Sequence, residues 1–118
     1  MTPRTILVLS VAGLALVGVG TAAARPSTTQ ATTVKVTAKD FSFALSTKTV
    51  KAGRVTFVIR NASPVMHDFA IAGHRSKMIG PGGTTRLTVT LKPGRYPYKC
   101  TVDSHAGLGM KGVLRVTR

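Results

Sequence analysis

Apolar and polar residues alternate along most of this 118-residue chain, and this alternation constrains its fold more than any other feature. A period of two places every second side chain on the same face of a β-strand. Turn-forming Gly, Pro and Asn residues separate the alternating runs, and no run after residue 24 has helical spacing. The pattern predicts an all-β, Greek-key β-sandwich of about seven to eight strands. The clearest alternating runs cover residues 34–38, 41–45, 55–59, 67–72, 87–91, 95–99 and 111–117.

The first 24 residues have a different character. Arg4 precedes an apolar run from Ile6 to Val19, and residues 22–24 are the three small alanines expected at a signal-peptidase site. We therefore predict a signal peptide over residues 1–24 and an exported protein that is periplasmic, cell-surface or secreted. An uncleaved membrane anchor is the alternative, because the apolar stretch is nearly long enough to span a bilayer. Residues 25–33 then predict a flexible tether, and residues 34–118 a single small domain.

Cys100 is the only cysteine of the chain, and it starts a C-x4-H-x4-M segment with His105 and Met110. A thiolate, an imidazole and a thioether are donors that suit copper, and a second histidine would complete a His2Cys plane with a weak axial Met. His67 is the leading candidate, because it follows a Pro-containing turn at the start of a predicted strand. His74 competes with it, although we expect His74 to lie in a solvated loop. The sequence thus predicts one copper ion bound by His67, Cys100, His105 and Met110.

Other interpretations of these residues are open but less favoured. A lone cysteine is often a buried, inert thiol, and Cys100 with His105 as base would be a nucleophile without an orienting third residue. Zinc accepts Cys and His, but a thioether suits it poorly. We expect Met66 and Met78 to fill the core rather than bind metal. None of these patterns indicates an enzyme.

Positive charge dominates the composition. The chain has 17 Lys and Arg against three Asp and no Glu, which gives a formal net charge of +14 at pH 7. Such a balance often indicates nucleic-acid binding, but export argues against that partner. We expect an acidic protein partner, or an anionic membrane or cell-wall surface, to be attracted instead.

Several segments around the candidate ligands belong to one pattern: the C-x4-H-x4-M loop, Tyr96-Pro-Tyr98-Lys-Cys100, Met110-Lys-Gly112 and the upstream His67-Asp-Phe69. Together they resemble the cupredoxins, the plastocyanin, azurin and sulfocyanin group of blue copper proteins, over residues 34–118. The resemblance implies a cupredoxin-like sandwich and a type 1 copper with two histidines and Cys100 in plane and Met110 axial. It also implies a monomeric electron carrier that serves larger redox proteins, such as an acidic cytochrome or oxidase domain.

The resemblance leaves two points open. A copper carrier or buffer is the alternative function, because the same four residues would bind copper in either role. The residue after the first ligand histidine is often Asn in the family, whereas this chain has Asp68. A carboxylate there can still accept a loop N–H, but its charge would favour Cu(II) and lower the reduction potential. The family also implies docking through an apolar patch around His105, here Pro64, Val65, Ala106 and Leu108.

Overall fold

Two β-sheets face each other in the computed structural model, which describes residues 31–118 together with Gly13 and Gly18. The predicted signal peptide and nearly all of the predicted tether lie outside the described residues. One sheet has the order β2-β1-β4-β7, with β1 (Thr32–Lys39), β2 (Ser42–Leu45), β4 (Gly53–Asn61) and β7 (Thr84–Leu91). The other has the order β3-β9-β8-β5-β6, with β3 (Thr49–Lys51), β5 (Ala70–Ile71), β6 (His74–Arg75), β8 (Gly94–Lys99) and β9 (Lys111–Thr117).

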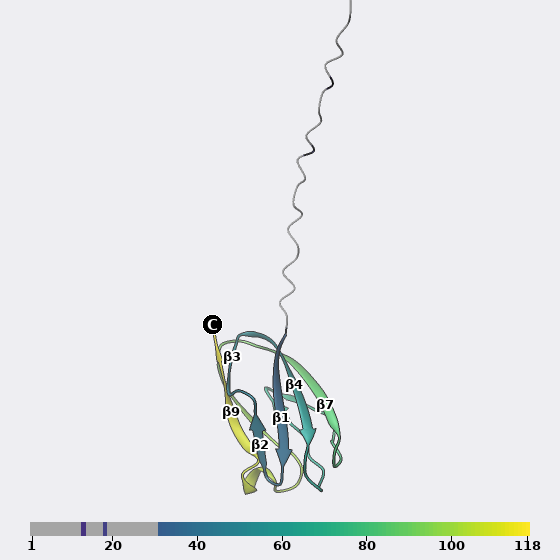
Figure 1. Cartoon of the computed structure of the whole chain (residues 1–118). Helices are drawn as coiled ribbons and strands as arrows, with labels where there is room; N and C mark the ends of the chain where they lie inside the picture. Colours follow the sequence, from purple (N-terminus) through teal and green to yellow (C-terminus); the bar gives the residue numbers. More distant parts are fainter. Residues whose placement is uncertain (1–12, 14–17, 19–30) are drawn as a thin grey trace, which may run out of the picture.

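The predicted all-β sandwich is confirmed (Figure 1). Parallel pairing of β1 with β4 and of β3 with β9 makes both sheets mixed, while the other strand pairs are antiparallel. The described strands number nine, because the short strands β3 and β6 lie outside the alternating runs of the sequence. No helix within residues 31–118 is long and apolar enough to cross a membrane.

The strand predicted over residues 67–72 is mostly wrong, because only Ala70–Ile71 forms β5. His67 makes an isolated bridge with Ile79 instead, and the N–H of Phe69 donates to the hydroxyl of Ser76 at 3.0 Å. The positive φ of Ala72, 52°, then turns the chain directly into β6. The segment after His67 is therefore a tight hairpin against the sheet edge.

The core lies between the sheets, where the alternating apolar side chains of both inner faces meet. Its aromatic centre is Phe69, whose ring centroid lies 5.0 Å from Phe57, 5.3 Å from Phe43 and 5.4 Å from Tyr98. Tyr98 packs over Gly112 so closely that an added Cβ there would overlap its ring. This packing fixes β8 against β9 directly beside the segment that connects them.

The connection from β8 to β9 lies at one end of the sandwich, and β1 begins at the opposite end (Figure 1). It contains a single turn of 3-10 helix, Ala106–Leu108. The backbone N–H of Cys100 donates to the carbonyl of Met110 at 3.0 Å, so the connection is closed at its base. The candidate ligands of this segment are thus held at one pole of the domain.

Candidate metal centre

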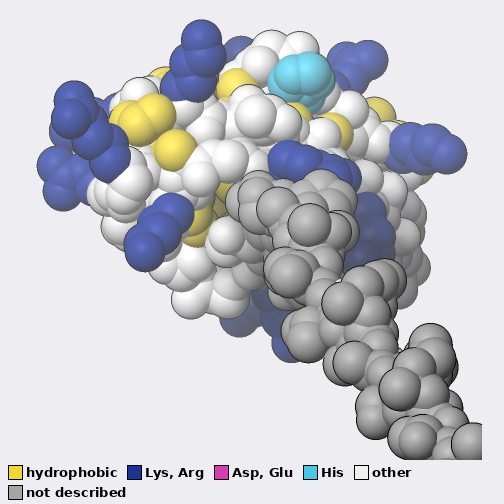
Figure 2. Space-filling view, turned by 90° about the horizontal axis from the view of Figure 1, so that it is seen from above, with side chains coloured by type: hydrophobic (Ala, Val, Ile, Leu, Met, Phe, Trp, Pro, Cys, Tyr) yellow, Lys and Arg dark blue, Asp and Glu magenta, His cyan; other side chains and the backbone are white. Residues whose placement is uncertain are grey.

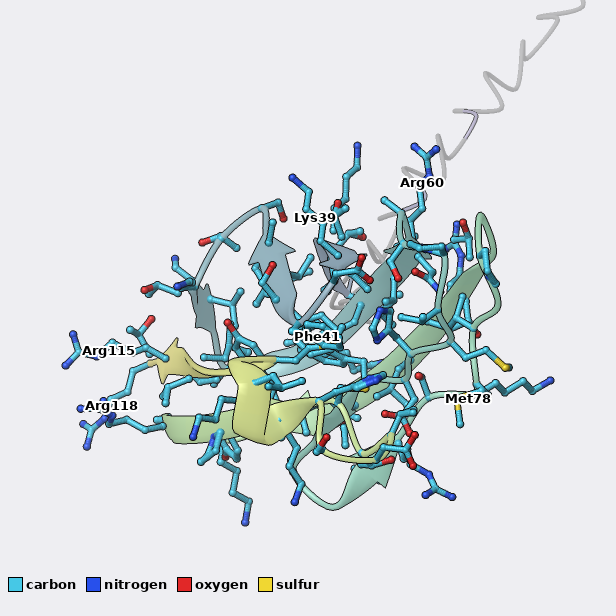
Figure 3. The ribbon with its side chains drawn as sticks, turned by 90° about the horizontal axis from the view of Figure 1, so that it is seen from below. Lys39, Phe41, Arg60, Met78, Arg115 and Arg118 are labelled. Atoms are coloured by element: carbon cyan, nitrogen blue, oxygen red, sulfur yellow. The ribbon has the colours of Figure 1, made fainter. Side chains whose placement is uncertain are left out.

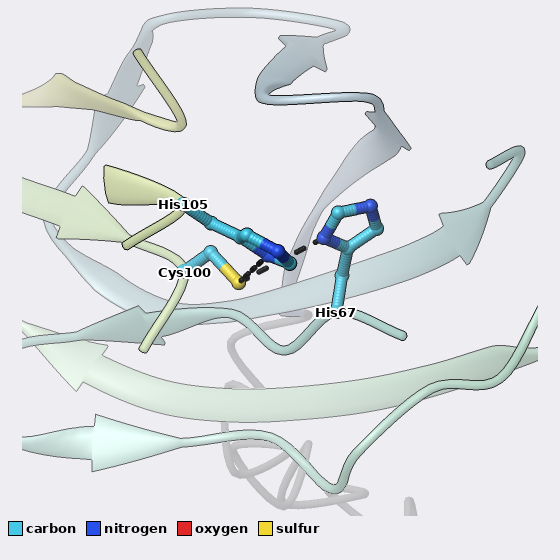
Figure 4. A group of neighbouring side chains, drawn as sticks. All are labelled: His67, Cys100 and His105. Atoms are coloured by element: carbon cyan, nitrogen blue, oxygen red, sulfur yellow. Dashed lines mark hydrogen bonds between the residues drawn. The ribbon is translucent and has the colours of Figure 1, made fainter. Parts of the chain in front are cut away.

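Three of the four predicted ligands converge at this pole. One donor atom from each of His67, Cys100 and His105 lies within 4.8 Å of the other two, and Figure 4 shows both rings directed at the sulfur. The Cys100 Sγ is 3.9 Å from Nδ1 of His67 and 3.7 Å from Nδ1 of His105. An ion bound at about 2.0 Å from nitrogen and about 2.3 Å from sulfur would separate trigonal ligands by about 3.7 Å. The spacing therefore fits one shared metal ion.

Met110, the fourth predicted ligand, packs against the cysteine of this group. It is fully buried and packs in a small cluster with Cys100 and Ala38. Its N–H donates to the carbonyl of His105 at 3.1 Å and its carbonyl accepts the N–H of Cys100, so Met110 is bonded to both other candidate ligands of this connection. Thiolate, imidazole and thioether together fit copper better than zinc, because the thioether is a soft donor.

His67 is oriented by a serine that the sequence analysis did not single out. Ser63 Oγ lies 2.8 Å from Nε2 of His67, accepts the N–H of Val65 at 3.0 Å and lies 3.2 Å from the carbonyl of Val65. A metal bound at Nδ1 would leave the imidazole proton on Nε2, so Nε2–H would donate to Ser63 Oγ while the hydroxyl proton goes to the carbonyl of Val65. This tautomer leaves the lone pair of Nδ1 directed at the metal position, as a ligand histidine requires.

Asn61 holds the turn that carries Ser63. Its side-chain oxygen accepts the N–H of Ser63 at 2.9 Å, and its amide donates to the carbonyls of Val65 at 2.7 Å and Ile79 at 2.9 Å. Asn61 is fully buried, so these bonds are protected from water. The residue was visible in the sequence only as part of a turn, and its role depends on contacts that spacing does not reveal.

Asp68 links the first histidine segment to the cysteine segment, as expected for a carboxylate at this position. One oxygen accepts the N–H of Thr101 at 2.6 Å, and the other accepts the Thr101 hydroxyl. Asp68 is buried, with 1% of its surface exposed. Both bonds go to Thr101, so they fix the residue after Cys100 relative to the segment that carries His67.

Burial sets the protonation of the two innermost ligands. It lowers the pKa of His67, and the nearby His105 lowers this pKa further, so the imidazole is neutral at pH 7 and able to bind metal. Burial raises the pKa of the Cys100 thiol, while the N–H groups of Asp68 and Val102 directed at the sulfur oppose that rise. A metal must therefore displace the thiol proton.

His105 is the ligand nearest the surface, since it is half-buried whereas His67 is fully buried. The ring of Phe41 lies beside it, with a centroid distance of 5.0 Å. Figure 3 looks onto this pole, with Phe41 near its centre. Phe41 adopts a positive φ of 61° in the turn between β1 and β2, a conformation that apolar side chains seldom adopt. The turn thereby covers one side of the His105 ring.

The remaining candidates lie outside this group. His74 is exposed in β6 and is not part of the cluster. Met66 and Met78 do not fill the core as expected, because 49% and 51% of their surfaces are exposed. Their neighbours His67 and Ile79 form the inward-facing bridge, so alternation turns both methionines outward. Val65 and Leu108, from the expected apolar patch, are also exposed at 39% and 59%.

Comparison with known proteins identifies the class. A family model described as a cupredoxin-like domain matches residues 8–116, so the chain belongs to this family and the resemblance noted in the sequence is confirmed. No curated protein sequence matches the chain significantly.

Solved structures show the same fold. The chain is similar to reduced auracyanin from Roseiflexus castenholzii, with 24% identity over 75% of this chain and 98% of that one, and a TM-score of 0.64. It is also similar to auracyanin A from Chloroflexus aurantiacus, described as a blue copper protein, with 23% identity over 75% and 100% and a TM-score of 0.63. A multicopper oxidase from Campylobacter jejuni is 17% identical over 80% of this chain but only 31% of the oxidase, with a TM-score of 0.63.

Proposed function

We propose that this protein is an exported blue copper protein that carries single electrons between redox partners, and that it is not itself an enzyme. The observation that carries the proposal is the convergence of His67, Cys100 and His105 at separations that suit one ion, with Met110 buried beside the sulfur. Bound copper would supply a one-electron couple between Cu(I) and Cu(II).

Each residue has a distinct part in this proposal. Cys100 provides the thiolate and His67 the inner imidazole, which Ser63 holds in one orientation. The half-buried His105 provides the edge through which an electron reaches the surface. Exposed Val65 and Leu108 provide apolar area for close approach by a partner. The excess of basic residues would attract an acidic partner to the domain.

The experiment is copper loading of the wild-type protein and two matched variants. We expect one copper per chain by metal analysis, intense blue absorption from the Cu(II)–thiolate bond, and reversible voltammetry. Cys100→Ser should abolish the colour, because a hydroxyl replaces the soft thiolate, whereas His74→Ala should leave it unchanged. Blue absorption that survives in Cys100→Ser would refute the ligand assignment. Loss of the metal on each reduction would favour a copper carrier over an electron carrier.

A further inference from the structure

We propose that the outer face of the five-stranded sheet binds the surface of an anionic lipid bilayer. The first observation is the register of β8 and β9, which places Arg95 directly opposite Arg115 and Lys99 directly opposite Lys111. All four side chains are exposed on the outer face. Like charges directly opposite each other destabilise an antiparallel pair. The fold therefore tolerates two unfavourable pairs on the same face, which points to an anion that offsets them.

These pairs belong to rows that cross the sheet. Lys99 also lies opposite Ala70, which in turn lies opposite Arg75, so one cationic row runs over four strands. An apolar pair, Pro97 and Val113, separates this row from the arginine pair, which is four residues or about 13 Å away along the strands. A shallow groove of about 960 Å³ runs over the apolar pair and the lysine pair. Strands β3, β5, β6, β8 and β9 contain no acidic residue.

The outer face of the four-stranded sheet has basic residues of the same kind in a different arrangement. There the register places Lys35 and Arg86 on either side of Val58, and Arg54 opposite Thr90. Arg60 lies opposite Thr84 and Thr37. Among the described residues of this face, no Lys or Arg lies directly opposite another Lys or Arg. The crowding on the five-stranded sheet is therefore a property of that face and not simply of the high net charge.

Seen from the end where β1 begins, Lys and Arg side chains surround the domain and no acidic side chain is in view (Figure 2). With so few acidic groups on the chain, the anion that compensates the crowded face must come from outside it.

A lipid surface fits this face better than a protein does. Lysine is depleted in protein interfaces, where aromatic residues, Met and Arg are enriched, and this face pairs two lysines and has no aromatic side chain among its exposed residues on β8 and β9. Here the centre is a small apolar pair, Pro97 and Val113, with cations on both sides of it along the strands. Anionic headgroups present negative charge at many positions at once, and each basic residue near them adds to the attraction. Because the face forms the side of the sandwich, bound protein would keep its His105 pole free.

The test compares two double variants with the same change in charge. Arg95→Glu with Arg115→Glu alters the crowded face, and Arg54→Glu with Arg86→Glu alters the other sheet. The protein is used as isolated from an expression host, with or without copper, so the result does not depend on the metal assignment. Binding is measured by flotation at about 0.1 M salt, with vesicles of phosphatidylcholine and phosphatidylglycerol and with vesicles of phosphatidylcholine alone.

We expect the wild-type protein to bind only the vesicles with phosphatidylglycerol. The crowded-face variant should lose affinity by about tenfold or more, and the control variant by less than about threefold. Arg95→Glu alone should weaken binding while raising the melting temperature, because it places opposite charges across the strands. This combination excludes misfolding as the cause.

Three results would overturn the proposal. Wild-type protein that does not bind phosphatidylglycerol vesicles would contradict it outright. Equal losses in the two double variants would show that net charge alone drives binding. Unchanged vesicle binding by the crowded-face variant, together with weaker binding to an acidic redox protein, would assign the face to a protein partner instead.

Discussion

Replacing Ser63 with alanine removes the hydroxyl that bonds Nε2 of His67 at 2.8 Å. His67 is fully buried, so its Nε2–H would have no access to water and would lose its acceptor. An unsatisfied buried polar group costs about 1–3 kcal/mol. The imidazole would also be free to rotate away from the orientation in which Nδ1 is directed at Cys100. We therefore expect Ser63→Ala to weaken metal binding as well as the fold.

The loss of metal affinity and the loss of stability are separate quantities. Loss of the partner that orients a ligand histidine typically lowers metal affinity by about 10- to 100-fold. At about 1.4 kcal/mol for each factor of ten, this is about 1.4–2.8 kcal/mol of binding free energy. Competition with a copper chelator measures the affinity, and electron paramagnetic resonance of the Cu(II) protein reports the ligand geometry.

Ser76 supplies a matched control. Its hydroxyl is also buried, accepts the N–H of Phe69 at 3.0 Å and donates to the carbonyl of Lys77 at 2.9 Å, but it contacts no ligand. Ser76→Ala should lower the free energy of unfolding by about 1–2 kcal/mol and leave the affinity and the spectrum unchanged. Ser63→Thr keeps the hydroxyl and should therefore keep the copper affinity and the spectrum of the wild-type protein. Wild-type affinity and spectrum in Ser63→Ala, or equal losses in Ser76→Ala, would refute the role of Ser63.

Two further predictions concern charge at the site. Asp68→Asn keeps an acceptor for the N–H of Thr101 but removes a negative charge next to His67 in sequence, so Cu(II) loses stabilisation and the copper reduction potential should rise. Voltammetry that shows no change or a fall would contradict this. Because burial raises the pKa of the Cys100 thiol, that thiol is protonated at pH 7 and copper binding should release about one proton, so affinity should fall about tenfold per pH unit on acidification. His67, whose pKa is lowered, is already neutral and should release none. Calorimetry in two buffers of different ionisation enthalpy counts the protons, and a count near zero would show that the thiolate is not the ligand.

The alternation of apolar residues was sufficient to predict the sandwich and both strands that flank the site. The final strand was predicted at residues 111–117, where β9 lies, and the strand at 95–99 lacks only Gly94 of β8. Long antiparallel partners make such strands regular, so the period-two pattern holds along both, interrupted on the outer face only by Pro97 and Val113. The prediction for residues 67–72 was mostly wrong because the backbone of His67 pairs only with Ile79 in an isolated bridge, and the N–H of Phe69 donates to the hydroxyl of Ser76 instead of to a strand.

The convergence of His67, Cys100 and His105 could be expected from the sequence, because donor type and spacing are properties of the sequence. The groups that orient the ligands were not, because they depend on how turns fold onto one another. Ser63 lies four residues before His67 and contacts it only because Asn61 holds the intervening turn closed. Phe41 lies 64 residues before His105 in sequence and reaches its ring through a backbone conformation that its residue type does not suggest.

The hydrogen bonds around the ligands bear on the choice between an electron carrier and a copper carrier. His67 is held by Ser63, the Cys100 backbone by the carbonyl of Met110, and the His105 N–H by the carbonyl of Val102 at 3.1 Å. All three bonds join protein groups and none uses a metal-binding atom, so a change of oxidation state does not need to break them. Transfer of copper to another protein would require ligands to move and exchange, which these bonds resist. Electron transfer requires the ligands to stay in place, and the arrangement of the site therefore favours that function.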